Sequence, residues 1–106
     1  MMAGQMQIRA RMISGDVADV KVLITHDMET GLRKDAKTKN LIPPHFINNF
    51  IATLNGKTVL ESQWGTGVAK NPFVGFRVKG AKPGDFVAIS AVDNLGEKFD
   101  HNAIVI

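Results

Sequence analysis

The pair Asn55-Gly56 lies between two runs of apolar and β-branched residues, 46–54 and 57–64. Asn-Gly is the preferred pair for a two-residue type I′ turn, because both central residues of that turn need a positive φ. The sequence therefore predicts an antiparallel hairpin. A tight hairpin narrows the possible folds more than any other feature of this chain, since it makes two consecutive strands neighbours in one sheet.

Both faces of this hairpin carry large apolar side chains in the register that a two-residue turn gives. The first face has Phe46, Phe50, Ala52 and Val59. The second face has Ile47, Ile51, Leu60 and Trp64. A sheet with one solvated face should instead alternate apolar and polar residues. We therefore expect the first face to belong to the core and the second to bind another protein, although a bulge at Asn55-Gly56 would exchange the two faces.

Several other segments alternate apolar and polar residues with the period of two that half-buried strands show. The strands expected from this pattern cover 6–12, a segment through Val20 that ends at His26, 73–79, 85–92 and 97–106. Turn residues separate them, and the chain shows no helical pattern. With the hairpin, these segments make seven short strands, which indicates one all-β domain over residues 1–106. The expected architecture is an antiparallel, immunoglobulin-like β-sandwich.

The stretch 27–44 is polar and has neither a helical nor a strand period. A segment of this length without secondary structure is unusual in a small domain, and such segments tend to be functional or mobile. The most concentrated charge of the chain lies within it, at Arg33, Lys34, Lys37 and Lys39. This cluster could attract an anion or an acidic partner, or it could be a solvated loop.

The residues that enzymes and metal sites use give no pattern here. The chain has no cysteine, which excludes disulfides, thiolate ligands and thiol nucleophiles. None of its serines lies in a Gly-x-Ser-x-Gly elbow. The histidines His26, His45 and His101 show no ligand spacing, so they are expected at the surface or at strand ends rather than at a metal. We expect no catalytic residue, no metal and no cofactor.

Charge and hydropathy exclude further classes of partner. The net charge is +3, with 13 basic and 10 acidic residues, and most of the aromatic residues fall on expected core positions. A mildly basic solvated surface is therefore expected rather than a nucleic-acid site. No apolar run reaches the length of about 20 residues that a membrane span needs. The first residues contain no apolar signal region, so we expect no secretory signal on this chain.

Several motifs together resemble the SoxZ family. They are His26-Asp-Met-Glu-Thr-Gly31-Leu-Arg33-Lys34-Asp35, Ile42-Pro43, Phe46-Ile47, Asn55-Gly56-Lys57, Val68-Ala-Lys70-Asn71-Pro72-Phe73 and the turn 80–85. The resemblance runs in order from Met6 to the end of the chain. One departure is Ala69, where the family pattern suggests Ser, and it affects one local hydrogen bond only.

The resemblance implies a non-catalytic subunit of a SoxYZ-like sulfur carrier. Its partner would be a SoxY-type subunit whose mobile C-terminal arm holds a cysteine, and that cysteine carries sulfur intermediates while other enzymes of thiosulfate oxidation act on them. The resemblance also implies a periplasmic location, reached by export with the signal-bearing partner. It leaves open whether the isolated chain forms a homodimer.

Two hypotheses of function follow, and they use overlapping residues. The partner-binding residues expected for the carrier subunit are Arg33, Lys34, Ile47, Ile51, Leu60, Trp64, Lys70 and Asn71. The alternative is a stand-alone β-sandwich module that binds small oxyanions through Arg33, Lys34 and Lys70. Co-purification with a cysteine-bearing chain would favour the first, and sulfate binding by the isolated chain would favour the second.

Overall fold

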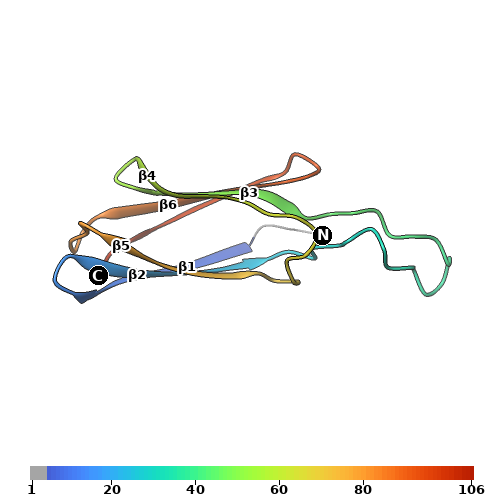
Figure 1. Ribbon diagram of the computed structural model, residues 1–106, viewed down its shortest axis with the longest axis horizontal. Helices are drawn as coiled ribbons and strands as arrows, with labels where there is room; N and C mark the ends of the chain where they lie inside the picture. The colour runs from blue at the N-terminus through green and yellow to red at the C-terminus, as the bar shows by residue number, and fades with distance from the viewer. Residues whose placement is uncertain (1–4) are drawn as a thin grey trace.

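The computed structural model describes residues 5–106 and contains two antiparallel sheets packed face to face (Figure 1). The three-stranded sheet has the order β1-β2-β5, formed by β1 (Gln5–Ser14), β2 (Val17–Thr25) and β5 (Phe73–Lys79). The four-stranded sheet has the order β4-β3-β6-β7, formed by β4 (Lys57–Gln63), β3 (Ile47–Leu54), β6 (Phe86–Asp93) and β7 (Lys98–Ile104). The predicted all-β sandwich is confirmed, because seven antiparallel strands fill two sheets.

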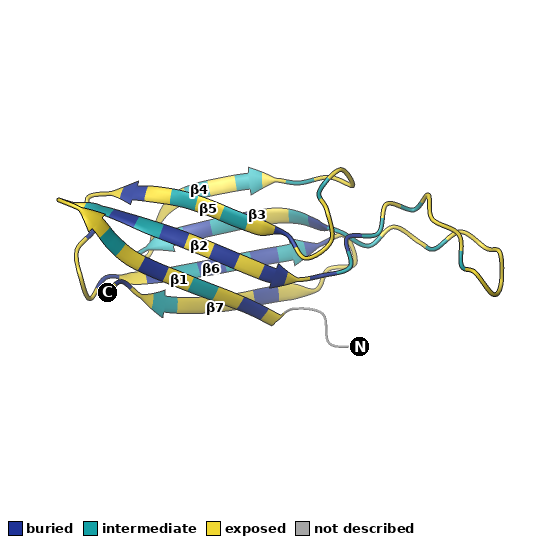
Figure 2. Ribbon diagram, turned by 90° about the horizontal axis from the view of Figure 1, so that it is seen from below, coloured by how far each residue is buried: buried dark blue, intermediate teal, exposed yellow. Residues whose placement is uncertain are grey.

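The core lies between the two sheets and comes mainly from their central strands (Figure 2). Along β2, Val20, Val22 and Ile24 alternate inward and are completely buried, and they are complemented by Phe50 of β3 and Ile89 of β6. Full burial of such a side chain stabilises the fold by about 1.5–3 kcal/mol. Within residues 5–106, no helix has the length and apolar composition that a membrane crossing requires.

The two long edges of the sandwich differ. At one edge the last residues of the chain join β1, because the amide of Met12 donates to the carbonyl of Ile106 at 2.8 Å and the amide of Ile106 donates to Ala10 at 3.1 Å. At the opposite edge β4 and β5 are the outer strands of different sheets. A groove lined by Leu60, Trp64 and other apolar side chains lies between them. This edge of the sandwich is therefore not closed by a further strand within residues 5–106.

The hairpin turn at Asn55-Gly56 forms as predicted, with φ of 51° and 85° at its two residues. Next to the turn, Thr53 pairs with Thr58 as expected, but a register shift then places Ala52 opposite Leu60. Val59 is thus an extra residue on β4. On β3 the predicted core residues Phe50 and Ala52 are completely buried. On β4 the predicted faces were wrong, because the bulge lies two residues inside this strand and shifts every later position by one.

The corrected register moves most of the predicted partner face to the core side. Ile47 is completely buried, because a second register shift in the pairing of β3 with β6 turns it inward. Leu60 and Trp64 pack against the core, whereas Val59, predicted as a core residue, is exposed. Of the predicted second face, Ile51 keeps an outward position and is half-buried.

The segment between β2 and β3 is a long extended ribbon that projects beyond the sandwich (Figures 1 and 2). Backbone bonds tie its two arms together: the amide of Glu29 donates to His45, that of Ile42 donates to Arg33, and that of Asp35 donates to Asn40. We call residues 27–46 the ribbon. The sequence showed no strand period here because the arms pair only at isolated positions, and Met28 is the buried core residue among those that the ribbon contains.

Candidate functional site

Three side chains meet where the ribbon joins the sandwich. The Nε2 atoms of His45 and His26 lie 2.7 Å and 3.4 Å from Oδ2 of Asp93. His26 and Asp93 are buried, and His45 is partly exposed. The two imidazole rings also touch edge to face, with centroids 4.4 Å apart. These three residues form a polar cluster, and His26 and Asp93 are two of the three buried polar residues within residues 5–106.

The members of this cluster lie at or near strand ends, and His45 precedes the first residue of β3 by two positions. His26 directly follows β2, and its Nδ1 accepts the amide of Met28 at 3.0 Å. Asp93 ends β6, and its Oδ1 accepts the amides of Leu95 and Glu97 in the β6–β7 turn, both at 2.9 Å. The carboxylate of Asp93 therefore links the β6–β7 turn to His26, just before the ribbon, and to His45 on its returning arm.

The electrostatics keep this carboxylate ionised. Burial raises the pKa of Asp93, but the hydrogen bonds from the amide of Glu97 and from His45 and His26 outweigh burial, so the pKa is lowered overall. An ionised carboxylate accepts on both oxygens, and all four of its partners here are donors. The cluster is a satisfied hydrogen-bond network, which is the condition under which a buried charge is tolerated.

The same three residues also have the composition of a metal site, since their ligand atoms lie within 4.8 Å of one another. The hydrogen bond at Nδ1 of His26 argues against that use. Because Nδ1 of His26 accepts the amide hydrogen bond, Nε2 carries the proton when the imidazole is neutral. A metal ligand instead needs a free lone pair on the coordinating nitrogen. Metal-bound histidines normally donate from their second nitrogen. The cluster as built is a structural anchor for the ribbon.

Sequence reasoning missed this convergence because it looked for metal-ligand spacing along the chain. His26 and His45 flank the unusual polar stretch, and that position was the one available signal. His101, which the sequence analysis grouped with them, lies exposed on β7 and is not part of the cluster.

The ribbon base also brings together two cations that the sequence analysis selected. Arg33 and Lys70 line one hollow with Asp27 and Glu29. Arg33 donates to both carboxylate oxygens of Glu29, at 3.1 Å and 2.6 Å. This hydrogen bond lowers the pKa of Glu29 and raises that of Arg33. Because Glu29 already pairs with Arg33, the hollow does not present the uncompensated positive charge that an oxyanion site requires.

Beyond this hollow the ribbon exposes apolar and basic side chains together. Leu32 is 83% exposed and Leu41 is 58% exposed, on opposite arms of the ribbon. Lys34, Lys37 and Lys39 are exposed beside them. Single exposed leucines are ordinary, but two on a projecting ribbon give that ribbon an exposed apolar surface.

The groove between β4 and β5 opens at the same end of the molecule. The Trp64 ring stacks on Phe50 with centroids 5.1 Å apart and 12° between the planes, and its Nε1 donates to Ser62. Leu60, Val68 and Phe73 complete the apolar lining. Trp64 therefore serves the core through one ring face and lines the groove at the surface.

The loop between β4 and β5 is fastened to the ribbon base by Asn71. Its Oδ1 accepts the amide of His26 at 3.0 Å, and its own amide donates to the carbonyl of His26 at 2.9 Å. Asn71 adopts a positive φ of 53°, which Asn tolerates better than most residues. This residue thus has a structural task, and its predicted contact with a partner stays a prediction.

Comparison with solved structures places the fold among known sandwiches. The chain is similar to a hypothetical protein, PH1083, from Pyrococcus horikoshii OT3, with a TM-score of 0.66 and 14% identity over 98% of this chain and 89% of that chain. It is also similar to the superoxide reductase (neelaredoxin) of Ignicoccus hospitalis, with a TM-score of 0.63 and 15% identity over 97% of this chain and 80% of that chain. At such identities the likeness shows the fold alone.

Comparison at the level of sequence families is more specific. No curated protein matches the sequence. The family described as "Sulphur oxidation protein SoxZ" matches residues 6–103. Because this match spans nearly the whole chain, the protein belongs to the SoxZ family.

Proposed function

We propose that this chain is the non-catalytic subunit of a SoxYZ-like sulfur-carrier heterodimer. Its partner is a SoxY-like subunit whose cysteine covalently carries sulfur intermediates during thiosulfate oxidation. The heterodimer works in the periplasm, where this chain arrives together with the signal-bearing partner. Membership of the SoxZ family makes the chain a sulfur-oxidation protein, and the finer role rests on the arguments below.

The observation that carries this proposal is the anchored, projecting ribbon. The buried cluster of His26, His45 and Asp93 holds its base, while Leu32 and Leu41 remain exposed at its sides. We interpret this polar network inside a small core as the feature that orients the ribbon for contact with a partner. Exposed apolar surface on an oriented segment is typical of a protein interface.

The groove continues this surface toward the sandwich. Trp64 and Leu60 line it, and Trp is enriched among residues that dominate interfaces. Lys70 lies in the loop that joins the groove to the ribbon base. The proposed partner surface therefore comprises the ribbon and this groove. Ile47 is left out because it is completely buried.

The test is co-expression with a cysteine-bearing SoxY-like chain, followed by measurement of the dissociation constant of the purified complex. The Leu32→Ser/Leu41→Ser double variant should weaken the complex by about tenfold or more, since it removes apolar contacts but no core packing. Ile106→Ser is the matched control, because Ile106 is 76% exposed and lies away from the ribbon. Equal affinity of the ribbon variant and the control would contradict the proposed surface.

The alternative role as an oxyanion module has its own measurement. Sulfate and thiosulfate are titrated into the isolated chain by calorimetry, with Lys70→Ala as the variant. The pairing of Arg33 with Glu29 leads us to expect no saturable binding. Saturable binding that Lys70→Ala abolishes would support the module instead of the carrier subunit. Light scattering of the same sample reports whether the isolated chain is a homodimer.

A further inference from the structure

The outer face of the three-stranded sheet gathers positive charge. Its outward-facing charged side chains are Arg9, Arg11, Lys21, Arg77, Lys79 and Asp19. Five cations thus stand beside one carboxylate on one sheet face, while the whole chain has a net charge of +3. We call this surface the basic face. It is separate from the ribbon, and it meets the groove at Phe73 of β5, which lines both surfaces.

The pairing of strands places two of these cations directly opposite each other. Arg9 of β1 faces Lys21 of β2 across the sheet. Like charges in that position oppose strand pairing. Asp19 offsets little of this repulsion between Arg9 and Lys21, because its carboxylate is shared between Lys21 at 3.8 Å and Arg77 at 3.9 Å. The basic face therefore contains a repulsive pair that an anionic partner would relieve.

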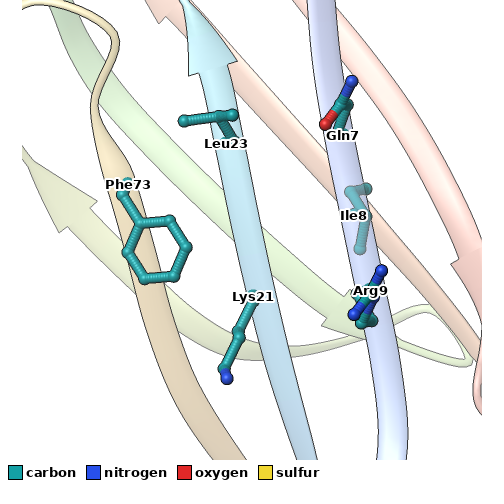
Figure 3. Close-up of a pocket in the computed structure, with 6 residues that line it drawn as sticks. All are labelled: Gln7, Ile8, Arg9, Lys21, Leu23 and Phe73. Atoms are coloured by element: carbon teal, nitrogen blue, oxygen red, sulfur yellow. The ribbon is translucent and has the colours of Figure 1, made fainter.

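One end of the basic face is apolar. Leu23 of β2 faces Phe73 of β5, and these side chains are 40% and 62% exposed. Figure 3 shows the Phe73 ring beside Lys21, with Arg9 on the neighbouring strand, and these residues line one hollow. The Phe73 ring extends toward Gly75, where an added Cβ would lie 3.7 Å from its Cε1 atom.

The outer face of the four-stranded sheet is different. Its central positions on β3 and β6 are uncharged and small or apolar, namely Ile51, Thr53, Ala88, Ser90 and Val92. Its charged neighbours on the outer strands include Glu61 and Asp100 as well as Lys98. Positive charge is therefore concentrated on one side of the sandwich rather than spread over it as a general aid to solubility.

We infer that the basic face docks an acidic protein surface that also presents an apolar or aromatic side chain to Leu23 and Phe73. Charge complementarity selects an anionic partner. The apolar end favours a protein over a nucleic acid. A single-stranded nucleic acid needs successive stacking aromatics, and Phe73 is the one aromatic residue on this face within residues 5–106. This contact goes beyond the heterodimer proposed above, because Arg9, Lys21 and Leu23 line neither the hollow at the ribbon base nor the groove.

The experiment uses poly-L-glutamate and a glutamate–tyrosine copolymer as defined acidic probes, with binding measured by fluorescence anisotropy at low and high salt. The Arg9→Glu/Lys21→Glu variant should lose about tenfold or more in affinity for both probes at low salt. The Lys57→Glu/Lys98→Glu variant has the same net charge but changes exposed lysines of the other sheet. Its affinity for the two probes should fall by less than about threefold, since the changes alter only the long-range electrostatic field at the basic face.

A second variant tests the apolar end. Phe73→Ala should abolish the preference for the tyrosine copolymer over poly-L-glutamate, while it leaves binding of poly-L-glutamate within about twofold. If the charge reversal unfolds the chain, the milder Arg9→Gln/Lys21→Gln variant replaces it, and a loss of several-fold is still expected.

Two results would overturn the inference. The first is an equal loss of affinity in the charge-reversal variants of the two sheets, because binding would then follow net charge alone. The second is tighter binding of an oligodeoxythymidylate than of either polypeptide, if affinity for the oligonucleotide also falls more on charge reversal of the basic face than on charge reversal of the other sheet. That pattern would assign the face to nucleic acid. Neither result bears on binding of the SoxY-like subunit through the ribbon.

Discussion

The Nε2 atom of His45 lies 2.7 Å from Oδ2 of Asp93, although 48 positions separate the two residues in sequence. This contact closes the base of the ribbon onto the β6–β7 turn. His26 reaches the same oxygen from the end of β2. One buried carboxylate thus contributes to the orientation of the ribbon and of the leucines on it, together with the hydrogen bonds between Asn94 and the returning arm of the ribbon.

Asp93→Asn tests this dependence. The amide has nearly the shape of the carboxylate, but it carries no negative charge. Its NH2 group also cannot accept a hydrogen bond, whereas both oxygens of the carboxylate can. We expect the free energy of unfolding to fall by about 1.5–3 kcal/mol, the range for hydrogen bonds to a charged group. Urea denaturation measures the change. An unaltered denaturation midpoint would show that the cluster does not stabilise the fold.

The pH dependence of stability follows from the lowered pKa of Asp93. A carboxyl group with a lower pKa in the folded state contributes stability that is present above its unfolded pKa, about 3.9, and is lost as the pH falls through its folded pKa. We therefore expect an acid-induced loss of stability below about pH 4 that is smaller in Asp93→Asn. The difference between the two stability curves isolates this group from the other carboxylates. Parallel curves would be evidence against the assignment.

Trp64→Ala should destabilise the isolated chain, because the indole stacks on the completely buried Phe50. We expect a loss of about 2 kcal/mol, below the 3–5 kcal/mol of a fully buried aromatic residue, since one side of Trp64 lines the open groove. Leu95→Ala is the control: Leu95 lies exposed in a turn, and its truncation should cost within about 0.5 kcal/mol. Equal stability of the two variants would mean that Trp64 contributes little to the core.

Deletion of single residues of β4 tests the bulge. Removing Val59 keeps Thr58 opposite Thr53 and Leu60 opposite Ala52, so the faces of the strand are preserved. We expect a folded protein that loses about 1 kcal/mol or less. Removing Leu60 instead takes an apolar side chain from the core and should cost about 2 kcal/mol or more. If deletion of Val59 is the more damaging of the two, the bulge is placed wrongly. Thermal denaturation of both variants gives the comparison.

Much of the architecture was predictable from local patterns. The alternation along 73–79 predicted β5 with the bounds that the structure has, and Asn55-Gly56 predicted the turn between β3 and β4. The reason is that strand period and turn conformation depend on neighbouring residues, so a short segment contains the information. The motifs around His26 and Lys70 likewise identified the family without any long-range contact.

The register of the hairpin required the tertiary structure. Val59 is an ordinary β-branched residue, and nothing in the pattern 57–64 marks it as the bulged position. Its place is set by how β3 pairs with β4 on one side and with β6 on the other, and the second pairing is itself irregular near Ile47. A shift of one residue reverses which face each later side chain occupies, and so the assignment of Trp64 and Leu60 was inverted.

The candidate site depended even more on the assembled fold. By itself the sequence determined seven strands, one tight turn, a polar segment and a family. Only the packing of the two sheets brought the end of β2, the returning arm of the ribbon and the end of β6 to one point, where His26, His45 and Asp93 meet. Local patterns specify which residues lie along each strand. The positions of strand ends relative to one another follow from sheet order and twist, which are properties of the whole chain.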